Sequence, residues 1–310
     1  MKKWTLLLLI CSIALLGFSA GAFGAEDKKI KAGFIYVGPV GDYGFSHAHD
    51  LGRKFAEEKL DWLETVYVES VSESDSDRII DRLIQQQKCD VVFTNSFGFM
   101  DSTIKAGERY PDEIFMHCSG FKRSDNVGTY FGDLYQMYYL NGLMAGALTK
   151  TNKIGYVAAF PIPELIRHID AYALGIKAAN PEAKVHVKWI YAWYGPDKAR
   201  EAAESLIAEG CDTLAFTEDT PAVIEVGQSH TEKGKQIYTF SHYSAMQPYG
   251  EDSVVSGQLM NWGGMYVKIL EDIYSGSWTN EDVWWLAKEG AAILGGNERS
   301  EEHTSELQSL

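Results

Sequence analysis

The chain has 310 residues, of which 45% are hydrophobic, and carries 43 acidic against 28 basic side chains, for a formal net charge of −15. This length and apolar content are sufficient for two domains with buried cores. An acidic chain without a basic patch argues against nucleic acid and anionic lipid surfaces as partners, because both repel negative charge.

Residues 1–25 have the pattern of a secretory signal peptide. Two lysines precede an apolar run from Leu6 to Phe18, and small residues follow as far as Ala25. The run is shorter than the ~20 residues of a membrane span. Cys11 lies inside the run behind Ile10, where a lipoprotein signal needs a small residue, so no lipid anchor is expected. We therefore predict a soluble mature protein exported to the periplasm.

The other end of the chain has an unusual sequence. Residues 299–310 resemble the in-frame translation of a common sequencing adapter, and we interpret them as an artefact that is left out of reasoning about the fold. The natural chain is then expected to continue differently after Asn297. Residues 279–298 would be an incomplete C-terminal segment.

Strands and helices are expected to alternate through the rest of the chain, which predicts an α/β architecture with parallel sheets. Apolar, β-branched runs predict the strands, and amphipathic stretches predict the helices. The expected strands are 29–37, 64–68, 89–94, 114–118, 153–159, 185–191 and 211–217, and the expected helices are 47–59, 76–86, 100–109, 134–148, 164–179 and 196–208.

This order of elements occurs twice. The passage 78–94 is echoed by 201–217, and the Cys-Asp pairs that begin at Cys89 and Cys211 lie 122 positions apart. The duplication predicts two similar Rossmann-like lobes with parallel sheets, joined by a hinge. Ligands of such sheets bind beyond the carboxyl ends of the strands, so the two lobes are expected to close around a solute in the cleft between them.

The loop after the first strand contains glycines at positions 38, 41 and 44, but it has neither the G-x-G-x-x-G spacing of a dinucleotide site nor the Lys-Ser/Thr of a P-loop. We therefore expect no nucleotide cofactor, and interpret the glycines as a tight turn near a ligand. Tyr43 and Phe45 are aromatic residues on this loop, and Trp193 occupies the matching strand end of the second unit. One aromatic side chain from each lobe could hold a flat ring between them.

Polar residues close the corresponding strands of the two units. Asn95 follows a strand of the first unit, and Glu218 and Asp219 follow its counterpart in the second, so all three are candidates to bind the polar edge of a ligand. Solvent-exposed loops are the alternative for these positions. Arg167, near the start of a helix, could contact the ligand or lie on the surface.

No catalytic or metal-binding set emerges from the sequence. His47 and His49, two positions apart on a helix, point in directions that differ by about 200°, so no metal site is expected there. His117 and Cys118 lack an orienting third group, and the nucleophile-elbow pattern G-x-S-x-G is absent. We therefore expect no enzyme activity. Buried free thiols are expected at the three cysteines that follow the signal, Cys89, Cys118 and Cys211.

Four segments together resemble the basic membrane protein (BMP) family of ABC-transporter substrate-binding proteins. The resemblance implies the type I periplasmic-binding fold, a purine nucleobase or nucleoside as ligand, a permease in the inner membrane as partner, and a monomer. It covers the chain from Lys28 to about Gly290. The order and spacing of the four segments together are specific to the family. The segments are Gly41–Phe45, Lys153–Pro163, Trp193–Lys198 and Asn261–Gly263.

The resemblance also implies roles for residues. Phe45 and Trp193 match the two aromatic positions that hold the purine between them, while 130–133 matches the first crossover between lobes. It places the N-terminal lobe at 28–130 plus 261–278 and the C-terminal lobe at 131–260. The cleft segments that provide further contacts contain Asn95, Glu218, Asp219, Asn261 and Trp262.

One departure from the family pattern affects the expected ligand. Tyr243-Ser244-Ala245 stands where nucleoside-binding members carry an Asp-Ser-Asp loop for the ribose hydroxyls. Loss of both carboxylates favours a free nucleobase over a nucleoside. Two alternatives remain open: a non-purine solute for the importer, and a binding protein that reports its ligand to a membrane receptor.

Overall fold

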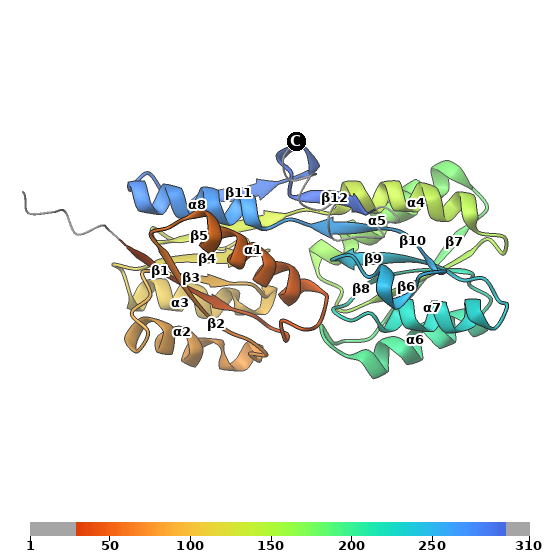
Figure 1. Ribbon diagram of the computed structural model, residues 1–310, viewed down its shortest axis with the longest axis horizontal. Helices are drawn as coiled ribbons and strands as arrows, with labels where there is room; N and C mark the ends of the chain where they lie inside the picture. Colours follow the sequence, from red (N-terminus) through yellow and green to blue (C-terminus); the bar gives the residue numbers. More distant parts are fainter. Residues whose placement is uncertain (1–28, 296–310) are drawn as a thin grey trace, which may run out of the picture.

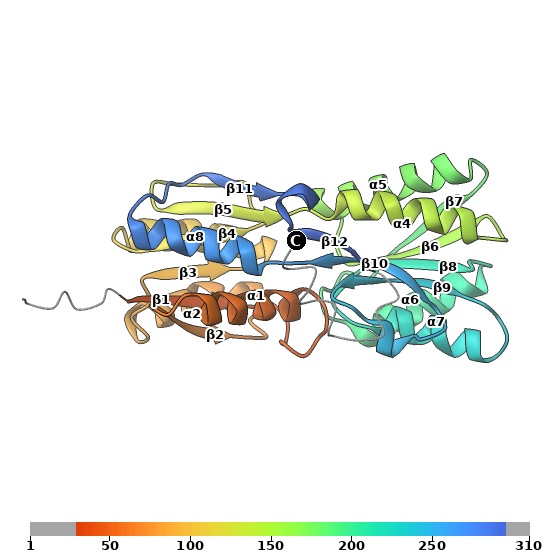
Figure 2. The same cartoon turned by 45° about the horizontal axis from the view of Figure 1, so that its top comes forward.

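The computed structural model describes residues 29–295, which form two α/β lobes lying side by side (Figures 1 and 2). The expected signal peptide and the 299–310 segment lie outside the described residues. Among residues 29–295, no helix combines the length and apolarity that a membrane crossing requires.

The first lobe contains a six-stranded sheet in the order β11-β5-β4-β3-β1-β2, in which every neighbouring pair is parallel. Helices cover both faces, with α1 and α8 packed together and α2 packed with α3. The strands are Ile30–Ile35 (β1), Leu63–Val68 (β2), Val91–Thr94 (β3), Ile114–Cys118 (β4), Val127–Gly132 (β5) and Asp282–Trp285 (β11); the helices are Phe45–Lys59 (α1), Ser76–Gln85 (α2), Met100–Arg109 (α3) and Gly263–Ser275 (α8).

The second lobe repeats this plan with the sheet order β12-β10-β9-β8-β6-β7, parallel except where β12 pairs with β10. Here α4 packs on α5 and α6 packs on α7. The strands are Lys153–Ala158 (β6), Lys184–Trp189 (β7), Thr213–Thr217 (β8), Tyr238–Tyr243 (β9), Val254–Met260 (β10) and Ala292–Gly295 (β12); the helices are Tyr135–Leu148 (α4), Pro163–Ala179 (α5), Pro196–Ala208 (α6) and Ala222–Glu232 (α7).

The strand registers confirm the duplication. Gly33 of β1 pairs with Val92 of β3, and Gly155 of β6 pairs with Leu214 of β8. Both residues of the second pair lie 122 positions after those of the first, which is the spacing of the sequence repeat. The two central strand pairs are therefore built alike.

The chain passes between the lobes three times within the described residues: after β5, after β10, and between β11 and β12 (Figure 1). The last passage follows helix α8, and its two short strands extend one sheet each, β11 beside β5 and β12 beside β10. The sequence analysis gave no strand at either position.

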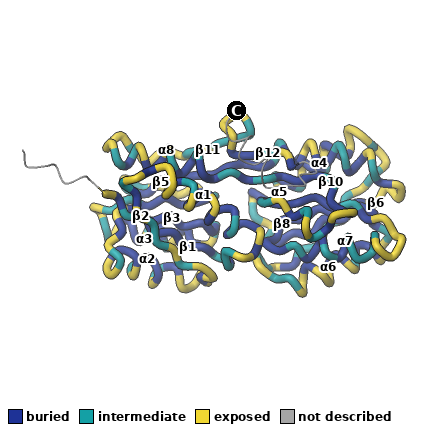
Figure 3. Tube along the Cα trace, in the orientation of Figure 1, coloured by how far each residue is buried: buried dark blue, intermediate teal, exposed yellow. Residues whose placement is uncertain are grey.

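Buried residues concentrate in the sheets and on the inward helix faces, while the outer helix faces are exposed (Figure 3). This arrangement follows from amphipathic helices covering both faces of a parallel sheet. The carboxyl ends of the strands carry loops that face the other lobe, and these loops position the candidate site.

Candidate ligand-binding site

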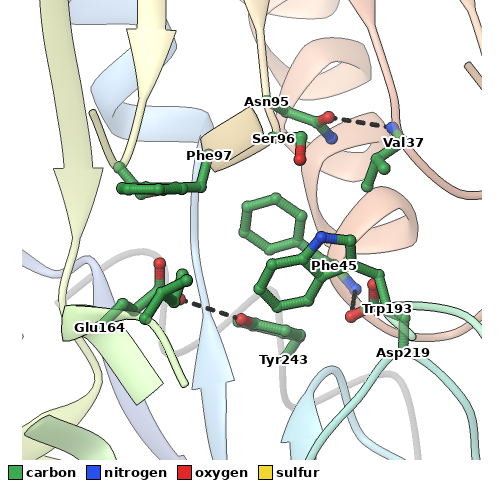
Figure 4. Close-up of a pocket in the computed structure, with 11 residues that line it drawn as sticks. Val37, Phe45, Asn95, Ser96, Phe97, Glu164, Trp193, Asp219 and Tyr243 are labelled. Atoms are coloured by element: carbon green, nitrogen blue, oxygen red, sulfur yellow. Dashed lines mark hydrogen bonds between the residues drawn. The ribbon is translucent and has the colours of Figure 1, made fainter. Parts of the chain in front are cut away.

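A narrow cavity lies between the two lobes, at the carboxyl ends of the central strands (Figure 4). Both lobes contribute side chains to its wall, and the wall combines aromatic rings with buried polar groups. The residues that line it are Val37, Phe45, Asn95, Ser96, Phe97, Ser119, Ile162, Glu164, Trp193, Asp219 and Tyr243.

Two of the predicted aromatic residues enter this cavity from opposite lobes. Phe45 begins α1 of the first lobe, and Trp193 lies on the loop after β7 of the second. The Trp193 Nε1–H donates to Oε1 of Glu73 in the first lobe at 3.4 Å, and the same oxygen accepts a bond from Ser96 Oγ at 2.8 Å. The indole, which belongs to the second lobe, is thus bonded to the first lobe as well.

Trp262 lies behind Phe45 and does not line the cavity. Its ring stacks on His49, with centroids 4.1 Å apart and planes inclined by 15°. Phe45 meets His49 edge to face at 4.3 Å and Trp262 edge to face at 6.1 Å. This buried stack fixes the direction in which the Phe45 ring faces the cavity.

Two polar side chains in the cavity wall keep an atom without a partner among the described residues. Asn95 Oδ1 accepts the Val37 N–H at 3.1 Å, and its Nδ2 is unpaired. Asp219 Oδ1 accepts the Phe45 N–H at 3.4 Å, and its Oδ2 is unpaired. Buried polar atoms normally have partners, so this donor and this acceptor suit a ligand that presents the complementary groups.

Glu164 and Tyr243 form a second polar element of the wall. Glu164 lies in the first turn of α5, and its Oε1 accepts a bond from the Tyr243 hydroxyl at 3.4 Å. Burial raises the pKa of Glu164. The Tyr243 ring also lies 5.0 Å from Phe45, so it closes the side of the cavity next to that ring.

Glu218 is fully buried beside Asp219 but does not line the cavity. Its Oε1 accepts a bond from Thr220 at 3.0 Å, and its Oε2 is unpaired within the described part of the chain. Burial raises the pKa of both carboxyl groups well above their ordinary values.

Two further candidates lie at the edges of the site. Tyr43 stacks on His47 at 4.9 Å and meets the edge of Tyr249 in the second lobe at 5.2 Å, so it contributes to the seam between the lobes. Asn261 is at the second crossover, where its side chain accepts the Gly263 N–H at 3.2 Å at the start of α8.

Arg167 lies outside the cavity. Its Nε donates to Asp133 Oδ2 at 2.6 Å, and its guanidinium lies over the Trp284 ring at 5.1 Å. Asp133 follows β5 and Trp284 belongs to β11, so Arg167 connects two of the passages between the lobes.

The sequence analysis missed several residues of the wall. Phe97 directly follows Asn95 and Ser96, so the strand-end argument could have included it. Glu164 gave no such signal. Acidic residues are common in the first turn of a helix because they interact favourably with the helix dipole, whether or not they bind a ligand. The other residues missed are Val37, Ser119 and Ile162.

With this geometry established, comparison with known proteins identifies the family. Residues 29–309 match the model of the Bmp family, described as ABC transporter substrate-binding protein PnrA-like. The chain belongs to this family. It is an ABC-transporter substrate-binding protein, and proteins of this kind act outside the cytoplasm.

Two relatives differ in the ligand that they are named for. A protein of Haloferax volcanii named as an ABC transporter glucose-binding protein, TsgA13, is 38% identical over 88% of this chain and 68% of its own. The purine-binding protein BAB2_0673 of Brucella abortus is 34% identical over 91% of this chain and 79% of its own. Family membership therefore leaves both ligand classes in question.

Solved structures show the same fold at low identity. A solute-binding protein of an ABC transporter system from Aeropyrum pernix has a TM-score of 0.79 at 19% identity, covering 90% of this chain and 80% of that one. A periplasmic solute-binding protein from Actinobacillus succinogenes, bound to D-allose, has a TM-score of 0.68 at 11% identity, covering 88% and 100%. The fold is thus the type I periplasmic-binding fold that the sequence predicted.

Proposed function

We propose that this protein is the binding component of an ABC importer for a purine, preferentially the free nucleobase, which it delivers as a monomer to a permease in the inner membrane. The observation that carries the proposal is the presence of Phe45 and Trp193, from opposite lobes, in the wall of one cavity (Figure 4). With the lobes in contact, as the hydrogen bonds between them indicate, one ring is available to each face of a planar base.

The energetics favour a flat aromatic ligand. Stacking of a base on an aromatic side chain contributes ~1–3 kcal/mol per base. The unpaired Asn95 Nδ2 and Asp219 Oδ2 add one donor and one acceptor, which match the ring nitrogens and N–H groups on the edge of a purine. The purine-binding relative from Brucella abortus gives this proposal further support.

The end of β9 and the residue that follows it support a base without ribose. Ser244 donates to the Tyr43 carbonyl oxygen across the seam, and the Tyr243 hydroxyl is engaged by Glu164. Neither side chain supplies a free carboxylate for ribose hydroxyls.

A sugar is the second candidate, because the Haloferax volcanii relative is named for glucose. Aromatic rings together with carboxylates also suit the faces and hydroxyls of a pyranose. The stacked arrangement proposed for Phe45 and Trp193 is the feature that separates the two ligands, since a planar ring can contact both side chains along its full faces.

Isothermal titration of the protein beginning at Glu26 with adenine, hypoxanthine, adenosine, guanosine and glucose tests the proposal. We expect the bases to bind most tightly. Tighter binding of nucleosides would contradict the ribose argument, and binding of glucose alone would replace the purine with a sugar.

A further inference from the structure

The start of helix α1 carries an unusual pair of buried acids, one from each lobe. Asp42 belongs to the loop after β1, and Asp219 belongs to the loop after β8 in the other lobe. Each is 2% exposed, and each has an Oδ2 atom without a partner among the described residues.

The two carboxyl groups bind consecutive backbone positions of the same turn. Asp42 Oδ1 accepts the Gly44 N–H at 2.8 Å and the His47 N–H at 3.1 Å. Asp219 Oδ1 accepts the next N–H, that of Phe45, at 3.4 Å. The backbone therefore holds the two groups close together, although they come from different lobes.

Within residues 29–295, no cationic side chain offsets this pair. Three further titratable groups face it, and all are buried: Glu218, from the loop of Asp219, Glu164, from α5, and the hydroxyl of Tyr243, from β9. The base on α1 nearest to Asp42 is His47, whose ring Nδ1 contacts the Val40 carbonyl oxygen. The N-terminal end of α1 favours one negative charge, but two buried carboxylates without a cation repel each other.

We propose that Asp42 and Asp219 form a proton-binding site that exists only when the lobes are closed, so that ligand binding takes up a proton. Opening of the hinge moves Asp219 away from the α1 turn and exposes both groups to water. The inference rests on the proposed function only in that lobe closure accompanies ligand binding.

The direction of the pH effect follows from linkage. Burial is the main cause that raises the pKa of Asp42 to about 7, and burial together with the Asp42 charge raises the pKa of Asp219. In the open form both groups return toward the ordinary value of about 3.9. As the pH falls below about 7, the equilibrium constant for closure then rises. The rise is up to about tenfold per pH unit when one proton is taken up.

Titration with adenine at about pH 5.5, 6.5 and 7.5, in buffers of different ionisation enthalpy, measures this proton uptake. We expect tighter binding and uptake of a proton as the pH falls. Asp42→Asn should reduce both while retaining the turn, because Asp219 is still buried on closure but no longer faces the Asp42 charge, and an amide oxygen accepts the same N–H groups. His47→Gln and the exposed control Asp61→Asn should behave like the unmodified protein.

A second measurement does not depend on the ligand. The radius of gyration from small-angle X-ray scattering without ligand should decrease as the pH falls in the unmodified protein and decrease less in Asp42→Asn. If adenine fails to bind at every pH, the purine proposal fails, and the scattering result still decides on the proton site. Proton uptake or compaction that is as large in Asp42→Asn as in the unmodified protein, or that never occurs, would overturn the inference.

Discussion

The indole of Trp262 stacks on the imidazole of His49 at 4.1 Å, directly behind the Phe45 ring. Trp262 is 1% exposed and begins the segment that carries the chain from the second lobe into α8. The crossover is thereby packed against the residue that faces the ligand cavity. A change in this stack should affect both the stability of the first lobe and the position of Phe45.

Replacing Trp262 tests the structural part of this relationship. Trp262→Ala should lower the free energy of unfolding by about 3–5 kcal/mol, because it removes a fully buried aromatic side chain and leaves a cavity. Urea denaturation followed by circular dichroism measures the change. A loss below about 1 kcal/mol would show that the stack does not contribute to the core.

Trp193→Ala should weaken ligand binding more than it lowers stability, in contrast to Trp262→Ala. The side chain is half-buried on a loop, so stability should change little, while the affinity for a purine base should fall by about 1–3 kcal/mol. Titration calorimetry measures the affinity. Phe121→Ala is the matched control, since that ring is 70% exposed and lies outside the cavity. Equal affinity in both variants would remove Trp193 from the site.

Gly44 is placed where the lobes touch. A Cβ atom added there would lie 2.6 Å from Asp219 Cα, closer than van der Waals contact allows. Gly44→Ala should therefore hold the lobes apart and weaken ligand binding. Gly41→Ala is a control in the same loop, because a Cβ atom there meets nothing within 4 Å. Ligand-induced compaction, measured by small-angle scattering, should be lost only in Gly44→Ala; its survival would refute the steric argument.

His117 provides a test of pH dependence away from the cleft. Burial lowers its pKa to about 3, and its Nδ1 lies 3.0 Å from Thr94 Oγ1. The unfolded chain, with an imidazole pKa of about 6.5, binds this proton first, so acidification below that value favours unfolding. The contribution from this one residue is about 2 kcal/mol between pH 7.5 and pH 5. The difference in unfolding free energy between the two pH values should therefore be smaller in His117→Gln than in the unmodified protein. An equal difference in the two proteins would contradict the assignment.

The duplicated fold could be predicted from the sequence because its signals are local. The Cys-Asp pairs at 89 and 211 mark the start of equivalent strands, and alternating apolar runs identify most of the elements between residues 29 and 217. The short strands β11 and β12 could not be found in this way. Their pairing with β5 and β10 depends on contacts that only the folded chain provides.

The candidate site could be predicted only in part. Phe45, Asn95, Trp193, Asp219 and Tyr243 come together in one cavity, since each ends or follows a strand at the same edge of its sheet or begins the next helix. Strand-end position does not determine which way a side chain points. Among the residues placed elsewhere, Trp262 turns into the core and Arg167 toward Asp133. The roles of the site residues in binding remain predictions.

A crystal structure of the protein with adenine tests the central claim most directly. We expect the base to lie face-on between the Phe45 and Trp193 rings, with its edge bonded to Asn95 Nδ2 and Asp219 Oδ2. A structure in which these rings point away from the bound molecule, or in which glucose occupies the cavity and adenine does not enter it, would contradict the account.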